Sequence, residues 1–299
     1  MANRGDGYRP GSIFARALAP LRTGSRNAVA QPHRKTIEEK WATYSRALII
    51  TAHPDDAEFL AGGTIAKMCD MGWDVTLCVA TSGDKGTRDT TITPQELAAT
   101  REAEQRAAAA VLGLSRVIFW GLPDGGLVEG SELREMAVKV IRQLKPDVVI
   151  TWDGFRAGFN HTDHRVIGRV VRDALYPAAH DPHYHPELTR AGIGPWRTAE
   201  LLLAGTDDAD YHVDIGLYLE KKLDAVRCHA SQIDVRDRAE MLKAWQEAAR
   251  RNKERQKRTG YIFAESFKRI EFRRPPGAPG TPPAEAEATT ATAASAPAR

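Results

Sequence analysis

Short apolar runs rich in Val and Ile alternate along the middle of the chain with longer segments of helical pattern. This alternation predicts βα units around a central parallel sheet, because strands buried on both faces read as continuous hydrophobic runs. Four candidate central strands lie at residues 47–52, 74–80, 116–120 and 147–152. A further strand is expected at Glu200–Ala204 and another, with only partial alternation, at Tyr261–Phe272.

The segments between the strands predict helices with recognisable ends. Thr93 followed by Pro94 is typical of an N-cap with proline at the first helical position, and Gly113 supplies a stop. The expected helices cover Leu60–Met71, Pro94–Leu112, Ser131–Leu144, Thr162–Leu175, Leu217–Cys228 and Arg236–Lys257. We therefore predict an α/β fold, with a Rossmann-like, mostly parallel sheet and helices on both faces in three layers.

The two ends of the chain depart from this pattern. Residues 1–40 carry eight Lys or Arg against three acids and predict a flexible basic arm, with an organelle transit peptide as the alternative. Residues 274–299 are almost wholly Pro, Ala, Thr, Gly and Glu and predict a disordered tail. Residues 41–273 are expected to form one domain.

Composition narrows the classes of function. The 299 residues are 42% hydrophobic, enough for a substantial core. Lys and Arg total 42 against 39 acids, and the basic arm accounts for the excess, so neither nucleic acid nor an anionic membrane is an expected partner. No apolar run approaches the roughly 18 residues of a membrane span. Three scattered cysteines without a CxxC pair favour a reducing cytoplasm.

Two polar clusters, His53–Asp56 and His161–His164, each follow an apolar run, and about a hundred residues separate them. The carboxyl ends of parallel strands meet at one edge of a sheet, which is where such sheets keep their ligand sites. We therefore expect the two clusters to build one metal site.

His53, Asp56 and His164 are first-choice zinc ligands, and a catalytic zinc leaves its fourth position to water. Asp55 need not be a ligand and can act as general base, because the ion lowers the pKa of bound water to about 7. Taken alone, the first cluster also fits an N-cap carboxylate ahead of the helix at Leu60. The second cluster favours the metal site.

His161 suits the task of stabilising the oxyanion of amide hydrolysis, and its protonated form can give a proton to the leaving amine. Asp163 is expected to pair with His161, to orient its imidazole and to raise the pKa of that imidazole.

At these residues the chain resembles the PIG-L/LmbE family of metal-dependent N-deacetylases. The resemblance covers about residues 46 to 270 and rests on segments in family order: Ala52–Glu58, Gly62–Thr64, Thr81–Gly86, Thr100–Glu102, Gly121–Gly125, His161–His164, His229–Gln232 and Ala264–Phe267. Two departures are that Ala57 intervenes before Glu58 and that Asp84 stands where Glu is more usual. Neither departure removes a proposed ligand.

The resemblance implies an LmbE-like fold with zinc held by His53, Asp56 and His164, Asp55 as base and His161 as transition-state stabiliser. It also implies removal of an acyl group from an amino sugar, often N-acetylglucosamine. The expected reaction is hydrolysis of the amide of a small amino-sugar conjugate by attack of zinc-bound water. Fe²⁺ or Co²⁺ can occupy the same ligands, and a homo-oligomer is left open.

Four further residues are candidates for substrate binding. Arg88 resembles a family arginine that contacts sugar or diphosphate groups, although a solvated loop charge fits equally well. Asp124 in a Pro-Asp-Gly turn can bond sugar hydroxyls or serve the turn alone. Asp214 and His229 are candidates for lining the pocket.

His180, His183 and His185 lie in a loop broken by prolines. Their spacing invites a second metal, but loop histidines near the mouth of a pocket are the simpler interpretation.

Two other functions also fit parts of the sequence. A metal phosphoesterase also places His and Asp at sheet ends, but such sites usually hold two metals and more carboxylates. A catalytically inactive Rossmann-like binding module is disfavoured because no GxGxxG follows the first strand.

Overall fold

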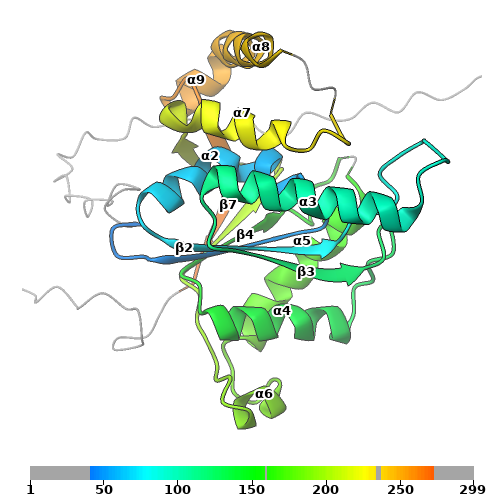
Figure 1. The fold of residues 1–299 in the computed structure, drawn as a ribbon. Coiled ribbons are helices and arrows are strands. Elements are labelled where there is room, and N and C mark those ends of the chain that lie inside the picture. Colours follow the sequence, from blue (N-terminus) through cyan, green and yellow to red (C-terminus); the bar gives the residue numbers. More distant parts are fainter. Residues whose placement is uncertain (1–40, 159, 234–236, 273–299) are drawn as a thin grey trace, which may run out of the picture. The chain divides into compact units, whose positions relative to one another are not determined.

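The computed structural model describes residues 41–158, 160–233 and 237–272, which build a seven-stranded sheet with helices on both faces (Figure 1). The predicted basic arm at residues 1–40 and the predicted tail at 274–299 lie outside the described residues.

The strand order is β3-β2-β1-β4-β5-β7-β6. The first five strands are parallel, and β7 runs antiparallel between β5 and β6. Their bounds are β1 Arg46–Thr51, β2 Asp74–Thr81, β3 Arg116–Leu122, β4 Val148–Trp152, β5 Glu200–Ala204, β6 Tyr211–Asp214 and β7 Ala264–Glu271. The predicted mostly parallel α/β class is confirmed.

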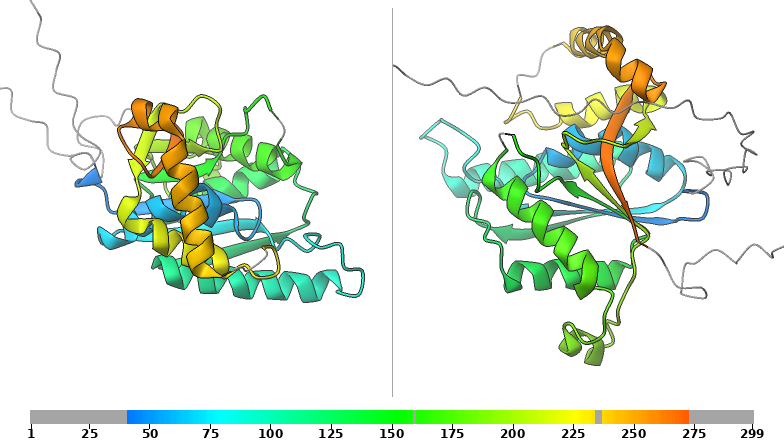
Figure 2. Two further views of the ribbon diagram at one scale, coloured as in Figure 1. Left: turned by 90° about the horizontal axis from the view of Figure 1, so that it is seen from above. Right: turned by 180° about the vertical axis from the view of Figure 1, so that it is seen from behind.

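Helices cover both faces of this sheet. They are α2 Asp56–Asp70, α3 Pro94–Leu112, α4 Ser131–Leu144, α5 Thr162–Asp173, α6 Pro186–Arg190, α7 Leu219–Arg227, α8 Arg238–Arg251 and α9 Lys253–Thr259. Helices α2, α3 and α7 lie on one face, with α8 and α9 beyond α7 (Figure 1). Seen from behind, α4 and α5 share the other face (Figure 2).

Four differences from the sequence prediction concern local signals. Helix α2 begins at Asp56, four residues before the expected Leu60. Strand β6 was not predicted, because four residues at a sheet edge carry little periodicity. The long helix expected at Arg236–Lys257 is interrupted at Asn252 between α8 and α9, and α7 begins two residues later than expected.

The core has two apolar layers, one on each side of the sheet. In β1 the consecutive residues Leu48, Ile49 and Ile50 are all at most 1% exposed. Because successive side chains of a strand point to opposite faces, Ile49 packs in the layer beneath α2 and α3, and its two neighbours pack in the layer beneath α4 and α5. Burial on both faces explains the unbroken apolar run.

Strand β1 lies between β2 and β4, and this position defines where a ligand site can form. From β1 the chain moves outward through β2 to β3, and it then returns through α4 to β4 on the other side of β1. The carboxyl ends of β1 and β4 therefore meet at a topological switch point, the usual ligand crevice of open α/β sheets.

The start of α2 is supported by strand β7. The helix is kinked at Ala61 (φ −145°), and beyond the kink the Glu265 carboxylate accepts the N–H groups of Gly63 (3.0 Å) and Thr64 (2.7 Å). A Cβ on Gly63 would lie 2.6 Å from Ile215. Gly63 of the motif is therefore required for close packing.

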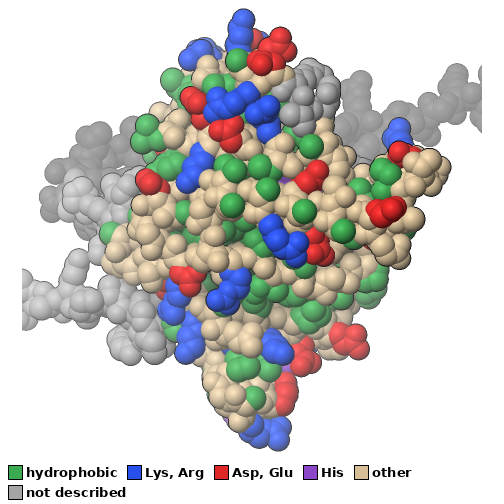
Figure 3. Space-filling view, viewed as in Figure 1, with side chains coloured by type: hydrophobic (Ala, Val, Ile, Leu, Met, Phe, Trp, Pro, Cys, Tyr) green, Lys and Arg blue, Asp and Glu red, His purple; other side chains and the backbone are tan. Residues whose placement is uncertain are grey.

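Two further observations bear on partners. On the face shown in Figure 3, acidic and basic side chains are interspersed. Among the described helices, none combines the length and the apolar character that a membrane span needs.

Candidate metal and catalytic site

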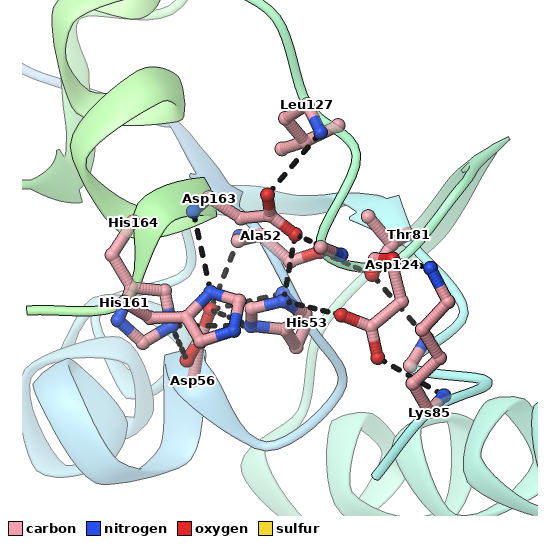
Figure 4. Close-up of polar contacts among 12 residues, drawn as sticks. Ala52, His53, Asp56, Thr81, Lys85, Asp124, Leu127, His161, Asp163 and His164 are labelled. Atoms are coloured by element: carbon pink, nitrogen blue, oxygen red, sulfur yellow. Dashed lines mark hydrogen bonds and ion pairs between the residues drawn. The ribbon is translucent and has the colours of Figure 1, made fainter.

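The two predicted clusters meet at the carboxyl ends of β1 and β4 (Figure 4). His53 Nδ1 lies 3.1 Å from His164 Nε2, and Asp56 Oδ1 lies 3.1 Å from the same nitrogen. The third separation, from His53 Nδ1 to Asp56 Oδ2, is 3.8 Å. The three predicted ligands are thus brought together, with His164 Nε2 close to both of the others.

Asp56 is held by three donors to one of its oxygens. Oδ2 accepts the backbone N–H groups of Ala52 (3.1 Å) and His53 (2.9 Å) and the indole Nε1–H of Trp152 (3.0 Å). Burial raises the pKa of this carboxyl, but the contacts with His164 and His53 outweigh burial and hold the pKa below its usual range. Asp56 is therefore an anion with Oδ1 directed at His164.

Acceptors behind each histidine fix its tautomer. His53 Nε2 lies 3.1 Å from carboxylate oxygens of both Asp124 and Asp163, and His164 Nδ1 lies 3.0 Å from Asn160 Oδ1. Burial lowers the pKa of His53, but these carboxylates and Asp56 raise it to about 9. An outer N–H held in this way turns the inner nitrogen toward the cluster, as in most protein metal sites, and a bound metal would displace the proton of His53 Nδ1.

The donor set fits a zinc-like ion. A tetrahedral ion with ligand bonds of about 2.0 Å separates its ligand atoms by roughly 3.3 Å, which is close to the 3.1 Å from His164 Nε2 to both His53 Nδ1 and Asp56 Oδ1. Two imidazoles and a carboxylate also suit Fe²⁺ or Co²⁺. His161 offers a fourth nitrogen within 4.8 Å of the histidine ligand atoms.

Asp55 has an unusual backbone at φ 97° and ψ −29°, a region that costs a non-glycine residue about 1–3 kcal/mol. It occupies the N-cap position of α2, yet its side chain makes no capping hydrogen bond with the described residues, so the simple capping alternative is wrong. Burial raises the pKa of Asp55 to about 7, with Asp56 adding to this effect and Arg101 opposing it. A carboxyl that titrates near neutrality suits a general base.

His161 is the N-cap of α5, and its Nδ1 accepts the backbone N–H of Asp163 (3.2 Å). The neutral ring therefore carries its proton on Nε2. Burial and the neighbouring His53 lower the pKa of His161, whose ring stands edge-on to that of His53 at 4.7 Å between centroids. The ring is suited to donate a hydrogen bond as a neutral group.

The expected pairing of the Asp163 carboxylate with His161 is wrong. Asp163 Oδ2 lies 3.1 Å from His53 Nε2 and accepts the N–H of Gly125 (2.7 Å), and Oδ1 accepts the N–H of Leu127 (3.2 Å). Figure 4 shows this carboxylate beside Asp124, on the side of His53 away from Asp56. Asp163 therefore orients a candidate ligand and the loop after β3.

Asp124 and Arg88 differ in their relation to the cluster. The Asp124 carboxylate contacts His53, its Oδ2 accepts the N–H of Lys85 (3.2 Å), and these contacts lower its pKa to about 2 although burial opposes them. Asp124 thus contacts a candidate ligand, and its contact with a sugar hydroxyl stays a prediction. Arg88 is exposed in the loop after β2, where a substrate can reach it.

The remaining two substrate candidates do not line the site. His229 is 0% exposed, with Nε2 3.3 Å from Glu58 Oε2. Asp214 ends β6, four strand spacings or about 19 Å from β1, and accepts the N–H of Gly216 in a local turn. Both predictions are therefore corrected, because one side chain is sealed in the interior and the other lies at the far sheet edge.

Sequence reasoning gave no role to several residues that contact the cluster. Trp152 stacks on His164 with 3.8 Å between ring centroids and 12° between planes. Asn160 holds the same histidine, and Arg101 and Gln105 contact Asp55. Trp152 was interpreted only as an apolar strand end, and Arg101 only as part of a motif.

Comparison with known proteins agrees with this geometry. The PIG-L family model, described as GlcNAc-PI de-N-acetylase, matches residues 48–175, which include both clusters. Diacetylchitobiose deacetylase from Thermococcus kodakarensis is 34% identical over 196 residues, which are 66% of this chain and 73% of that protein. The chain belongs to the PIG-L family. A second PIG-L relative, 1D-myo-inositol 2-acetamido-2-deoxy-alpha-D-glucopyranoside deacetylase from Segniliparus rotundus, is 32% identical and aligned over 64% of this chain and 78% of its own.

Solved structures share the fold of this chain. N,N'-diacetylchitobiose deacetylase from Pyrococcus horikoshii matches with a TM-score of 0.70 and 29% identity, covering 77% of this chain and 85% of that one. The 4-carboxy-2-hydroxymuconate hydratase from Pseudomonas putida shares the fold at 21% identity and a TM-score of 0.63, covering 77% and 98%. A fold that also hosts a hydratase does not fix the reaction, so the chemistry depends on the site.

The predicted family, LmbE-like fold and deacetylase class are confirmed by these relatives. The described His and Asp groups can hold a metal ion, as a metal-dependent deacetylase requires.

Proposed function

We propose that this chain is a zinc-dependent N-deacetylase that hydrolyses the amide of an N-acetylglucosamine-type amino-sugar conjugate. The main support is that His53 Nδ1 and Asp56 Oδ1 each lie 3.1 Å from His164 Nε2, with the outer atoms of all three side chains already held by other partners. The substrate class is supported by the names of the relatives, which are deacetylases of diacetylchitobiose and of a 2-acetamido-2-deoxy-glucopyranoside.

His53, Asp56 and His164 would hold the ion. When bound, a divalent metal supplies Lewis-acid polarisation of an amide carbonyl and lowers the pKa of a coordinated water molecule toward 7. Asp124, Asp163 and Asn160 keep the two imidazoles turned with their inner nitrogens toward the ion.

Asp55 and His161 would handle the protons and the developing charge. The Asp55 carboxylate, with its pKa raised to about 7, accepts the proton of the attacking water. His161, with its pKa lowered and Nδ1 engaged, donates its Nε2–H to the oxyanion that forms from the carbonyl oxygen. The proton taken up by Asp55 is then available to the leaving amine, and the base is regenerated.

Three broader assignments are part of the same proposal. Residues 41–273 act as one catalytic domain, with Arg88 at the substrate entrance. The partner is a small molecule. A cytoplasmic location is supported by Cys69, Cys78 and Cys228, which are free thiols in the structure.

The test is Asp55→Asn in the zinc-loaded protein. Free amine released from N,N'-diacetylchitobiose and other N-acetyl sugars is measured with fluorescamine, and metal content is measured by mass spectrometry. A base that is not a ligand should leave one metal per chain but lower kcat by about 10²- to 10⁴-fold. Loss of metal in this variant would contradict the assignment of Asp55. Release of phosphate without amine by the wild-type protein, or two metals per chain, would favour a phosphoesterase instead.

A further inference from the structure

The conformation of Asp55 requires support from outside its own segment. Its positive φ of 97° separates it from ordinary left-handed residues, such as Lys145 and His185 at 51° and 52°. The Asp55 N–H is accepted by Gln105 Oε1 at 3.0 Å, and its carboxylate Oδ2 lies 3.2 Å from Arg101 NH2. Both partners come from α3, so one helix holds the backbone and the side chain of this residue.

Arg101 is built into the interior around this contact. It is 4% exposed, and its guanidinium donates to the carbonyl of Pro54 (2.7 Å) and the carbonyl of Gly83 (3.0 Å) as well as to Asp55. The planar fork of arginine can serve several acceptors in fixed directions, which lysine cannot do. Arg101 therefore joins the loop after β2 to the Pro54-Asp55 turn.

The loop after β2 is shaped to admit this side chain. A Cβ on Gly83 would lie 2.2 Å from Arg101 NH1, and a Cβ on Gly86 would lie 2.3 Å from it. Arg101 therefore packs directly against Gly83 and Gly86. This contact joins the Ser82–Gly86 and Thr100–Glu102 segments, which are separate in the sequence.

Gln105 extends the same support inward. Its amide Nε2 donates to Glu58 Oε1 at 2.7 Å, and Glu58 Oε2 lies 3.3 Å from His229 Nε2. Gln105, Glu58 and His229 are each 0% exposed. This buried row links the segment that follows Asp55 to α3.

We propose that Arg101 is a positioning residue for Asp55, with Gln105 holding the Asp55 backbone, so that the carboxylate stays in one fixed orientation instead of capping α2. The inference rests on the proposed function, because it assigns Arg101 to the orientation of the proposed base. Arg101 acts through Asp55 and needs no contact with substrate.

The first experiment compares Arg101→Ala, Arg101→Lys and Arg106→Ala in the zinc-loaded full chain, with N,N'-diacetylchitobiose as substrate. Arg106 is the control, since it lies on α3 with its side chain 57% exposed, paired with Glu102. Misplacement of a catalytic group costs on the order of 100-fold, so Arg101→Ala should lower kcat by about that factor, with KM and metal content unchanged. Arg101→Lys should lose about 10-fold or more, because it cannot reproduce the fork. Added methylguanidine should restore part of kcat in Arg101→Ala and leave Arg106→Ala unaffected.

A double-mutant cycle with Asp55→Asn separates positioning from general structure. If Arg101 acts through Asp55, Arg101→Ala should change the residual kcat of Asp55→Asn by no more than about 2-fold. An equal loss in both backgrounds, a raised KM with kcat unchanged, or loss of metal would overturn the positioning role while leaving the proposed function standing. If Arg101→Ala does not fold, the same cycle with Arg101→Lys decides in the same way. Full turnover by Asp55→Asn would instead remove the base from the proposed function, and the positioning role with it.

Discussion

Two regions of this chain are rich in histidine, and they differ in the distances between their donor atoms and in the charges buried beside them. One is the cluster around His53 and His164 at the ends of β1 and β4, where the donor atoms lie 3.1 Å apart beneath buried carboxylates. The other is the loop that contains His180, His183 and His185, which leads into α6. In this loop His180 packs edge-on against the rings of Tyr176 and Phe272, and His183 is exposed.

The two regions are organised by opposite charges. Around His53, the buried carboxylates of Asp56, Asp124 and Asp163 fix the imidazoles. The loop is instead wrapped around fully buried Arg142, whose guanidinium donates to carbonyls from Ala178 to His185. Burial lowers the pKa of that guanidinium. In the loop, the buried guanidinium of Arg142 is the central cation and fixes the shape of the backbone around it. At the cluster, carboxylates and imidazoles converge and can bind a metal cation.

Removal of a ligand should have the largest effect. Asp56→Ala should lose metal and activity together, with metal affinity reduced more than about 100-fold, since even outer partners of ligands are worth 10- to 100-fold. Metal content after dialysis against a weak chelator, together with amine release, measures the effect. Asp70→Ala, at the exposed end of the same helix, is the control and should retain both. If Asp56→Ala kept one metal per chain, Asp56 would not be a required ligand, and the carboxylates of the cluster would not distinguish it from the histidine loop.

A smaller loss is expected when a ligand is retained and its support is removed. Trp152→Phe keeps an aromatic ring over His164 but loses the indole hydrogen bond to Asp56, and metal affinity should fall about 10-fold. Affinity is measured by competition with a chromophoric chelator. Trp196→Phe loses a comparable indole bond, to the Pro146 carbonyl, and should leave affinity unchanged. Equal affinities in the two variants would show that the contact with Asp56 does not matter for the ion.

Packing behind the site can be compared directly with packing just after α6. Gly205 and Gly192 both have positive φ, at 67° and 82°. A Cβ on Gly205 would lie 2.7 Å from the Trp152 ring, whereas a Cβ on Gly192 would meet no described atom within 4 Å. Gly205→Ala should therefore destabilise the metal-free protein by about 1–3 kcal/mol more than Gly192→Ala. Urea unfolding measures this difference, and similar midpoints for the two variants would argue against tight packing behind Trp152.

Local signals in the sequence were sufficient for much of the fold. The bounds of α3 and α4 were predicted to the residue, and for α3 the reason is visible in the capping box of Thr93 and Glu96 and in the left-handed Gly113. The start of α2 was missed because Asp56 and Glu58 are polar and buried, so they hide the apolar periodicity. Their burial depends on His164 and Gln105, which come from distant parts of the chain.

The candidate site follows the same division. His53, Asp56 and His164 could be named because residue type and strand-end position narrow the choice. The partners that orient them could not, since the contact of Asp163 with His53 and the stacking of Trp152 depend on how α5 and the loop after β3 approach β1. His229 was misplaced for the same reason: a motif residue beside a helix end gives no sign of which way its ring is buried.

The smallest effect is expected in the loop itself. Glu135, His185 and Glu187 offer ligand atoms within 4.8 Å of one another, but both carboxylates are exposed. His185 Nδ1 already lies 3.1 Å from Glu187, a surface pair worth about 0–1 kcal/mol. His185→Ala should therefore retain one metal per chain and a kcat within about 2-fold of wild type, measured beside His164→Ala, which should lose both. A fall from two metals to one in His185→Ala would reveal a second site in the loop, and proximity of donors without buried partners would then be sufficient to bind an ion.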